Sequence, residues 1–372
     1  MESLRGLGAH VVYENKVVTV TPGPVPAKGN VVPHESGTTL RLLLPVAASI
    51  CNDVDVDAKG RLPDRPLEPM LSEMKAHGVT FSQDKPPFTM TGRLQGGNFS
   101  MVGDVSSQFF SGLLLAAPQI GLSTITATTP LQSSDYVTLT TETMRDFGVE
   151  VEHTLPDTNI NEAFTVPFGA SFIGRDNYQI EGDWSNAAIW MVAAGMTGKP
   201  ITITGMNKNS VQADRRIMQV MIDAGCDVVW DGMNITVTGR ASKPIHVDLE
   251  QMPDMLPVMA ALACSISGES SFIKGARLRL KESDRLIAVA NLVRDLGGTV
   301  REEGDDLYII GSGILKGGHG DCVNDHRLVM AGTLMALISE NPVTLKDSEA
   351  ITKSYPDFFE DWNLLGGDAH GI

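Results

Sequence analysis

The sequence predicts an α/β protein of two similar lobes, each built from a structural unit that repeats about every seventy residues. Three observations predict this fold. An apolar, helix-like run that ends at a glycine occurs six times, a polar turn that begins an apolar helix occurs five times, and both recur at nearly the same spacing. Self-similarity at a fixed period indicates that one supersecondary unit is used several times.

The helix-like runs each end at a glycine that precedes a strand-like stretch. A glycine directly after a helix provides the left-handed conformation that ends it at low steric cost. The stretches that follow, such as DVVWDGMNITVTG, place turn residues between β-branched residues, which predicts strands. The closing glycines are Gly8, Gly78, Gly148, Gly225, Gly297 and Gly366.

The polar turns each precede a helix of small and apolar residues. Their Ser, Thr, Asp and Asn side chains are expected to cap the first N–H groups of those helices. A helix N-terminus also binds anions, so several of them facing one cleft would form a strong anion site. The turns lie at Glu35, Asp104, Asp183, Asp254 and Asp325.

Six closing glycines and five turns place the missing turn before residue 1. We therefore expect that the first of six repeats is incomplete and that the chain lacks an N-terminal segment. The last repeat also stops before its closing strands. Three repeats precede about residue 176 and three follow it, which predicts lobes at 1–176 and 177–372. The joint between them, around 164–183, contains proline and glycine.

Composition excludes several classes of protein. A hydrophobic content of 42% and a charged content of 20% are typical of a soluble globular protein, and no apolar run is long enough to span a bilayer. The net charge of −16 argues against nucleic-acid binding but not against a small anionic substrate. Cys51, Cys226, Cys264 and Cys322 lack metal or disulfide spacing, so we expect buried free thiols and a cytoplasmic protein.

The segment ARLRLKESDRLIAVANLV, residues 276–293, is the richest in chemistry. Arg277, Arg279, Lys281, Glu282 and Arg285 cluster just before an amphipathic helix. A solvated helix start would explain the charges, but a carboxylate among cations also suits proton transfer beside an anionic substrate.

A second cluster, Asp325, His326 and Arg327 in VNDHRLVM, is predicted at a helix N-terminus in register with the other turns. Arginine suits bidentate recognition of carboxylate or phosphate. Asp254 precedes an almost wholly apolar helix, where a carboxylate caps the helix, acts as a base, or does both.

Further candidates lie in the first lobe and near the C-terminus. Ser106, Ser107 and Gln108 begin a buried helix, either as caps or as phosphate ligands. Weaker candidates are Arg65 and Lys353, which are cations beside proline-containing turns. Gly37, in HESGTTLRLL, would let backbone N–H groups approach an anion closely.

In this order and at this period, the segments SGTTLRLL, DRP, SSQFFSGLLLAAP, RLKESDRL, NDHRLVMA and KSYPDFF resemble one family over the whole chain. This family is the 5-enolpyruvylshikimate-3-phosphate (EPSP) synthases, also called 3-phosphoshikimate 1-carboxyvinyltransferases. The resemblance implies an enolpyruvyl transferase-like fold in which each lobe has three βαβαββ units about a pseudo-threefold axis. It also implies transfer of the enolpyruvyl group of phosphoenolpyruvate to the 5-hydroxyl of shikimate 3-phosphate, without metal or organic cofactor. We further expect a monomer that uses no nucleic acid and no membrane.

The resemblance also implies roles for individual residues. The implied catalytic residues are Asp254 as the base for the 5-hydroxyl, Glu282 for the proton at the methylene carbon, and His326. The implied phosphoenolpyruvate ligands are Gly37, Arg65, Gln108, Arg285, Arg327 and Lys353. The implied shikimate 3-phosphate ligands are Ser106, Ser107, Gln108, Ser133, Asp254, Arg277 and Lys281.

Three departures from the family pattern leave alternatives open. The family's N-terminal Lys-Ser pair and the following Arg have no match here, which predicts weak binding of shikimate 3-phosphate and possible inactivity of this chain. Glu35 stands where the family has Asn, and the turn at Ser133 lacks the usual Pro. The alternatives are a binding-only remnant of the same fold, or a transferase that acts on UDP-N-acetylglucosamine.

Overall fold

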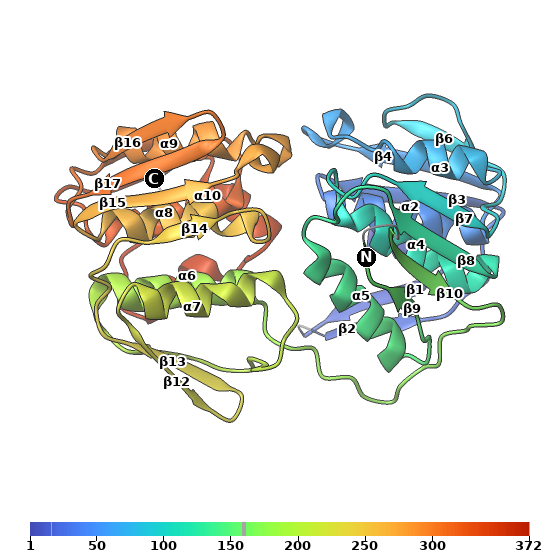
Figure 1. The fold of residues 1–372 in the computed structure, drawn as a ribbon, viewed down its shortest axis with the longest axis horizontal. Helices are drawn as coiled ribbons and strands as arrows, with labels where there is room; N and C mark the ends of the chain where they lie inside the picture. Colours follow the sequence, from blue (N-terminus) through green and yellow to red (C-terminus); the bar gives the residue numbers. More distant parts are fainter. Residues whose placement is uncertain (16, 158–160, 372) are drawn as a thin grey trace. The chain divides into compact units, whose positions relative to one another are not determined.

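The computed structural model describes residues 1–15, 17–157 and 161–371. The chain divides into two compact units, Met1–Tyr178 and Gln179–Ile372, which Figure 1 colours from blue to green and from green to red. Each unit mixes helices with small sheets, and the predicted α/β class is confirmed.

The first unit contains three sheets among its described residues, with strand orders β1-β2, β3-β4-β6-β5 and β7-β8-β10-β9. Its helical elements are α1 (Glu2–Gly6), α2 (Gly37–Ile50), η1 (Leu62–Asp64), α3 (Met70–Ala76), α4 (Ser107–Ile120) and α5 (Ser134–Asp146). Its strands are β1 (His10–Glu14), β2 (Val17–Thr21), β3 (Lys28–His34), β4 (Asp53–Ala58), β5 (Thr80–Phe81), β6 (Phe88–Thr91), β7 (Asn98–Met101), β8 (Ser123–Ala127), β9 (Glu152–Thr154) and β10 (Glu162–Val166).

The two four-stranded sheets of this unit have the same topology. In each, the first two strands are parallel and joined by a buried helix, α2 or α4. A second helix then leads to an antiparallel hairpin whose last strand pairs with the second strand. This is the βαβαββ unit, and α2 packs against α4 in the core. The remaining sheet, β1-β2, is an antiparallel hairpin that follows α1.

The second unit repeats this plan. Its helical elements are α6 (Trp184–Thr197), η2 (Ala213–Arg216), α7 (Ile217–Asp223), η3 (Pro253–Met255), α8 (Leu256–Cys264), η4 (Ala276–Leu280), α9 (Arg285–Asp295), α10 (His326–Ala336), η5 (Ser348–Lys353) and α11 (Phe358–Leu364). Its strands are β11 (Ile201–Ile203), β12 (Asp227–Asp231), β13 (Asn234–Thr238), β14 (His246–Asp248), β15 (Gly268–Ile273), β16 (Thr299–Glu303), β17 (Asp306–Gly311), β18 (Gly318–Asp321) and β19 (Val343–Lys346).

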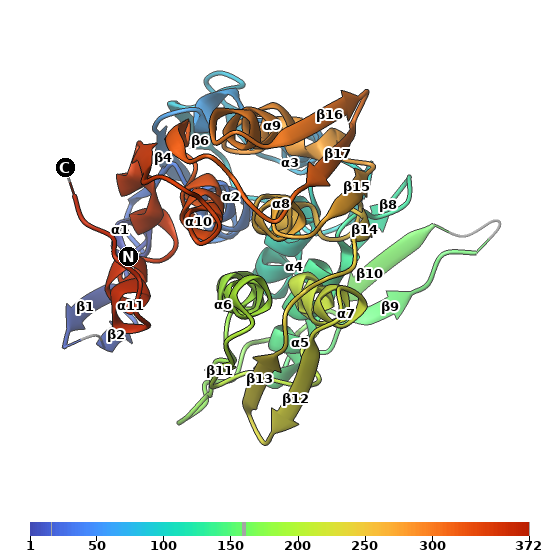
Figure 2. The ribbon, with the colours of Figure 1, turned by 90° about the vertical axis from the view of Figure 1, so that its left-hand side faces the viewer.

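The sheet β14-β15-β17-β16 has the complete topology, whereas β11-β13-β12 has three strands and β18-β19 has two within the described ranges. The apolar helices α6, α8 and α10 pack against one another, and Figure 2 shows them nearly end-on in the middle of the unit. Almost all residues of α6 and α8 are buried, which explains why these two helices are apolar on every side. The beginnings of α8, α9 and α10 carry most of the candidate site residues of this unit.

The six closing glycines take the predicted left-handed conformation. Their φ angles lie between 85° and 102°. At Gly148, the glycine N–H donates to the Arg145 carbonyl at 2.9 Å and the Val149 N–H donates to the Met144 carbonyl at 2.9 Å. The other five glycines make the same pair of bonds, the Schellman pattern. The sequence prediction of a common helix stop is therefore confirmed.

The predicted helix caps are only partly confirmed. Ser36 accepts a hydrogen bond from the Thr39 N–H at 3.1 Å, Asp183 caps α6, and Asp325 caps α10. Ser106 occupies the N-cap position of α4 without a side-chain hydrogen bond to the helix, so capping by this hydroxyl is wrong. The predicted free thiols are confirmed: all four cysteines are free and buried.

Candidate active site

The candidate site of the second unit is organised around Arg285, whose side chain is only 1% exposed. Its NH1 donates to Asp254 Oδ1 at 2.7 Å, and its NH2 donates to Glu282 Oε2 at 2.6 Å. Its Nε donates to Asp325 Oδ2 at 2.8 Å, and NH2 also reaches Asp325 Oδ1 at 3.2 Å. One guanidinium group therefore holds three carboxylates, two of which the sequence predicted to be catalytic.

Local structure explains this convergence. Asp254 lies in η3 directly before α8, Arg285 is the first residue of α9, and Asp325 is the N-cap of α10. Asp284 accepts a hydrogen bond from the Ile287 N–H and so fixes the start of α9. Because α8, α9 and α10 contact one another, their first turns bring these side chains together.

Asp254 is surrounded by cations. Lys281 Nζ lies 3.0 Å from Asp254 Oδ1, the same oxygen that Arg285 contacts. Arg327 donates from NH1 to the Asp254 backbone carbonyl at 3.2 Å, and its NH2 lies 3.8 Å from Oδ2. Burial alone would raise the pKa of Asp254, but the charges of Lys281, Arg327 and Arg285 outweigh burial and hold the pKa well below its usual value. The predicted cap is wrong, because η3 and α8 begin without a side-chain cap and the carboxylate instead forms ion pairs.

Asp325 is fully buried and was not among the predicted ligands or catalysts. Besides Arg285, it accepts hydrogen bonds from Ser283 Oγ at 3.0 Å and from the Arg327 N–H at 3.0 Å. Burial would raise the pKa of Asp325, but the Arg285 charge and hydrogen bond hold this pKa below its ordinary value. Asp325 thus fixes the orientation of Arg285. Its place in register with the other turns was the sequence signal for this role.

His326 is uncharged in this setting. Burial, together with the positive charge of Arg327, lowers the pKa of His326 to about 4. Its Nδ1 has no hydrogen-bond partner within the described residues and lies 3.9 Å from Asp325 Oδ1. A neutral imidazole can donate or accept a proton, but it adds no positive charge for an anion.

Lys281, Arg277 and Lys353 complete the charged surroundings of this group. Burial lowers the pKa of Lys281, and the nearby positive charges of Arg285 and Arg277 act in the same direction, against the opposing effect of Asp254. Lys353, at the end of η5, donates to the Asn324 carbonyl at 2.8 Å. It therefore lies beside the turn that begins α10.

In the first unit, Gly37, Arg65 and Gln108 come together with a fourth residue, Arg41. A Cβ atom on Gly37 would lie 2.9 Å from Arg65 NH1 and 3.3 Å from Arg41 NH1. Arg41 NH1 donates to Gln108 Oε1 at 3.0 Å, and Gln108 Nε2 donates to Thr38 Oγ1 at 2.8 Å. The first turn of α2 thus faces two guanidinium groups.

Arg41 was quoted in a motif but not predicted as a site residue. The available signal was its position four residues after Gly37 on the same helix face. Its 4% exposure is unusual for an arginine on an apolar helix.

The predicted serine ligands begin two neighbouring helices. Ser106 and Ser107 lie at the N-cap and first position of α4, next to Gln108. Ser133 is the N-cap of α5, with φ of 54°. All three are buried, and α4 packs against α5. Ser133 therefore belongs to a different turn from the group formed by Gly37, Arg65 and Gln108.

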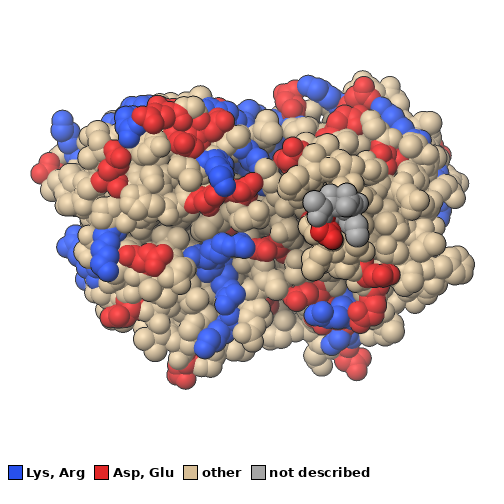
Figure 3. All heavy atoms as spheres, viewed as in Figure 1, with Lys and Arg blue, Asp and Glu red and all other residues tan. Residues whose placement is uncertain are grey.

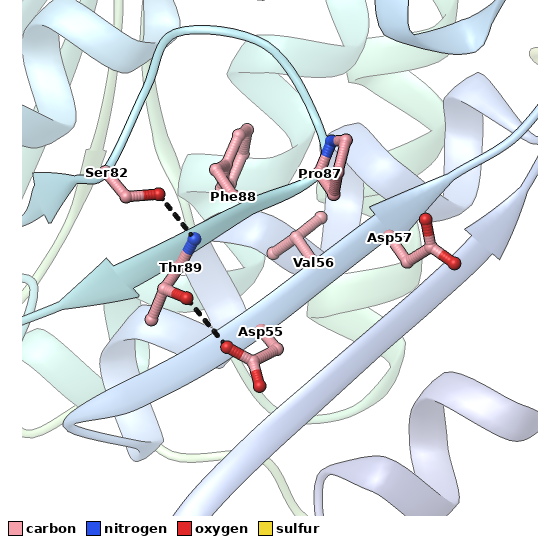
Figure 4. Close-up of a pocket in the computed structure, with 7 residues that line it drawn as sticks. All are labelled: Asp55, Val56, Asp57, Ser82, Pro87, Phe88 and Thr89. Atoms are coloured by element: carbon pink, nitrogen blue, oxygen red, sulfur yellow. Dashed lines mark hydrogen bonds between the residues drawn. The ribbon is translucent and has the colours of Figure 1, made fainter.

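A pocket of about 260 Å³ lies elsewhere in the first unit, over β4 and β6 (Figure 4). In it, Thr89 donates from its hydroxyl to Asp55 Oδ1 at 2.8 Å, and the Thr89 N–H donates to Ser82 Oγ at 3.0 Å. None of the predicted site residues lines this pocket. It is therefore separate from the two groups described above.

Figure 3 shows Lys and Arg residues interspersed with Asp and Glu residues on one face of each unit. The candidate site likewise brings cations and carboxylates together, in a chain with net charge −16. Within residues 1–15, 17–157 and 161–371, no group of three or more His, Cys, Asp or Glu residues is placed to hold a metal ion. None of the helices in these ranges has the length and apolarity needed to cross a membrane.

Cations and carboxylates at the starts of buried helices, in repeated βαβαββ units, define an α/β enzyme that handles small anions. The sequence model of the family "EPSP synthase (3-phosphoshikimate 1-carboxyvinyltransferase)" matches residues 1–362. The 3-phosphoshikimate 1-carboxyvinyltransferase of Clostridium kluyveri is 36% identical over 99% of this chain and 86% of that protein. The enzyme of the same name from Pyrococcus abyssi is 34% identical over 97% and 84%. The chain belongs to the EPSP synthase family, and it is an enolpyruvyl (carboxyvinyl) transferase.

A solved structure supports the fold. A solved structure of EPSP synthase from Acinetobacter baumannii matches with a TM-score of 0.77 and 23% identity, over 98% of this chain and 86% of that one. The predicted family and fold class are thereby confirmed. Of the alternatives, neither a binding-only remnant nor a UDP-N-acetylglucosamine transferase is favoured by these matches.

Proposed function

We propose that this protein transfers the enolpyruvyl group of phosphoenolpyruvate to the 5-hydroxyl of shikimate 3-phosphate and releases phosphate. In this reaction the hydroxyl oxygen bonds to carbon 2 of phosphoenolpyruvate while carbon 3 gains a proton. The tetrahedral adduct then loses phosphate from carbon 2 and a proton from carbon 3, which leaves an enolpyruvyl ether. The family name, 3-phosphoshikimate 1-carboxyvinyltransferase, describes transfer of a carboxyvinyl group to 3-phosphoshikimate.

The observation that carries the proposal is the ion-pair group of Asp254, Lys281 and Arg285, with distances of 2.7 and 3.0 Å on one carboxylate oxygen. Both substrates are anions, so their binding requires cations beside the reacting atoms. A carboxylate among those cations is positioned to accept the proton of a bound hydroxyl. We assign that role to Asp254.

Two further groups are assigned to proton transfer. Glu282, held by Arg285 at 2.6 Å, is assigned to the proton at carbon 3. His326, neutral and mostly buried beside Arg327, is assigned to proton transfer near the leaving phosphate. The Glu282 assignment agrees with the order of steps, since one proton is added at carbon 3 and one is removed there.

The remaining residues are assigned as ligands by the chemistry of their side chains. Guanidinium, ammonium and amide groups suit carboxylate and phosphate, and helix-terminal hydroxyl groups suit phosphate. The proposed phosphoenolpyruvate ligands are Gly37, Arg65, Gln108, Arg285, Arg327 and Lys353. The proposed shikimate 3-phosphate ligands are Ser106, Ser107, Gln108, Ser133, Asp254, Arg277 and Lys281.

We further propose that the protein is a cytoplasmic monomer with functional lobes at 1–176 and 177–372, and that the reaction uses no added cofactor. Four buried free thiols support a reducing compartment. Size-exclusion chromatography with light scattering tests the monomer directly.

The decisive experiment measures phosphate release with both substrates present and with each one omitted. We expect release only when both are present, and we expect Asp254→Ala to reduce turnover far more than it weakens binding. Unchanged turnover with poorer binding would make Asp254 a ligand instead of the base. Calorimetric binding of shikimate 3-phosphate without turnover would favour the binding-only alternative. Activity with UDP-N-acetylglucosamine instead would overturn the proposed acceptor.

A further inference from the structure

The proposed base and two proposed substrate ligands contact one another directly in the second unit. Asp254 Oδ1 accepts a hydrogen bond from Arg285 NH1 at 2.7 Å and lies 3.0 Å from Lys281 Nζ. Lys281 is a proposed ligand of shikimate 3-phosphate, and Arg285 is a proposed ligand of phosphoenolpyruvate. One oxygen of the base therefore contacts one cation from each proposed substrate site.

Arg285 is covered by the carboxylates that it binds. Its side chain is 1% exposed, whereas those of Asp254 and Glu282 are 21% and 27% exposed. The far side of the guanidinium is fixed by Asp325, which itself accepts from Ser283 Oγ at 3.0 Å. Because this anchored guanidinium cannot move outward without breaking buried bonds, an incoming anion reaches it only if Asp254 or Glu282 moves aside.

The backbone of Asp254 is held independently of its carboxylate. Arg327 NH1 donates to the Asp254 carbonyl oxygen at 3.2 Å. The side chain can therefore rotate away from Arg285 while the residue stays in place at the start of α8. Such a rotation separates the carboxylate from Lys281 and Arg285 and leaves its oxygens available to a substrate hydroxyl.

We propose that Lys281 and Arg285 hold Asp254 in an ion-paired, inactive state, and that the two substrate anions release it by taking those cations. This inference rests on the proposed function. Each anion competes with the same oxygen, so shikimate 3-phosphate frees it from Lys281 and phosphoenolpyruvate frees it from Arg285. The base becomes fully available only when both substrates are bound, and a single bound substrate meets a weaker base.

Electrostatics favours the same sequence of events. In the free protein the pKa of Asp254 is depressed by Lys281, Arg327 and Arg285 against the effect of burial. An anion that neutralises one of these cations weakens the depression, so the carboxylate gains basicity. The charged groups that act on Asp254 or on its partners include Lys281, Glu282, Arg285, Asp325, Arg327, Asp214 and Arg277.

Carbon-13 NMR tests the proposal on the protein labelled at its aspartate carboxyl carbons. The titration midpoint of the Asp254 carboxyl would be followed in the free protein, with shikimate 3-phosphate alone, and with phosphoenolpyruvate alone. No turnover occurs with one substrate. We expect each ligand to shift the midpoint to higher pH. An unchanged or lower midpoint with either ligand alone, in protein that binds that ligand, overturns the proposal.

Assignment and controls come from matched variants. The Asp254 signal is the one lost in Asp254→Asn, and Asp254→Glu removes the same signal if the asparagine variant does not fold. Asp55, which pairs with Lys28 at 2.6 Å in the first unit, should keep its midpoint when the ligands bind. Phosphate release by the wild-type protein distinguishes a failure of this inference from a failure of the proposed function. Turnover with an unmoved Asp254 midpoint rejects this inference alone, whereas absence of binding and turnover rejects the proposed function.

Discussion

Replacement of Asp325 by asparagine tests whether the buried carboxylate organises the second unit. Asp325→Asn preserves the shape of the side chain but removes its charge. The substituted side chain retains one carbonyl acceptor where the carboxylate accepts from Arg285 Nε, Arg285 NH2, Ser283 Oγ and the Arg327 N–H. Arg285 would then remain buried with one of its three carboxylate partners neutralised.

The expected loss of unfolding free energy follows from the burial of the ion pair between Arg285 and Asp325. Removing one partner of a buried ion pair typically costs about 3–5 kcal/mol of unfolding free energy. Because asparagine keeps an acceptor and Arg285 keeps Asp254 and Glu282, we expect a loss near the lower end, about 3 kcal/mol. The matched control is Asp305→Asn, which breaks an exposed pair with Arg279 and should cost about 1 kcal/mol or less.

The pH dependence has a definite sign. The pKa of Asp325 is lower in the folded protein than in the unfolded chain, where it is about 3.9. Its contribution to stability is therefore complete above that value and disappears as pH falls through the lower, folded-state pKa. The difference between the wild-type protein and Asp325→Asn should be full at neutral pH and should shrink on strong acidification.

Urea unfolding followed by tryptophan fluorescence is the appropriate assay. The four tryptophans, Trp184, Trp190, Trp230 and Trp362, all lie in the second unit, so the signal reports that unit alone. A loss for Asp325→Asn no larger than that for Asp305→Asn would refute the reasoning. So would a difference from the wild-type protein that grows as pH falls.

Three other experiments test separate parts of the structure. Gly37→Ala should raise the KM for phosphoenolpyruvate more than it lowers kcat, because the added Cβ would lie 2.9 Å from Arg65 NH1. Steady-state kinetics measures both constants, and an unchanged KM would contradict the assignment of Gly37 as a phosphoenolpyruvate ligand. The titration midpoint of the His326 ring, followed by NMR, should lie near pH 4. Its signal is identified by its absence from the spectrum of His326→Gln. A midpoint near the ordinary value of about 6.5 would show that the ring is not desolvated. Gly148→Ala combines a φ of 85° with a contact of 2.8 Å to a neighbouring isoleucine side chain, whereas Gly366→Ala has a φ of 93° and open space. Thermal unfolding should show a larger loss at Gly148 than the roughly 1 kcal/mol expected for left-handed alanine at Gly366, and equal losses would exclude a packing effect.

Local sequence signals predicted the features that depend on a few neighbouring residues. A glycine at a fixed period predicted each helix stop, and the polar residues before α6 and α10 predicted their caps. Ser106 and Asp254 had similar local signals, yet neither caps its helix. Cations on other elements form ion pairs with the Asp254 carboxylate, and the residues that pair are far apart in the sequence.

The same limit applies to the ion-pair group. Arg285 and Asp325 are separated by 40 residues, and their contact depends on the packing of α9 against α10. The sequence predicted both residues near helix starts but not the bond between them. Similarly, the burial of Arg41 follows from the packing of α2 against α4, which its own helix does not reveal. Most individual site residues could therefore be predicted, although Arg41 was not, whereas their pairing required the fold.

The common glycine stop has a consequence for molecular evolution. At all six positions the exit from the helix depends on two main-chain hydrogen bonds and one residue type. The other positions of each helix are therefore free to diverge as long as their apolar face is kept. Such divergence is compatible with a shared backbone at 23% identity and a TM-score of 0.77. A unit that contains its own glycine helix stop can be duplicated to give six copies that then diverge. Functional side chains can then change at the helix N-termini while the helix C-termini keep the same structure.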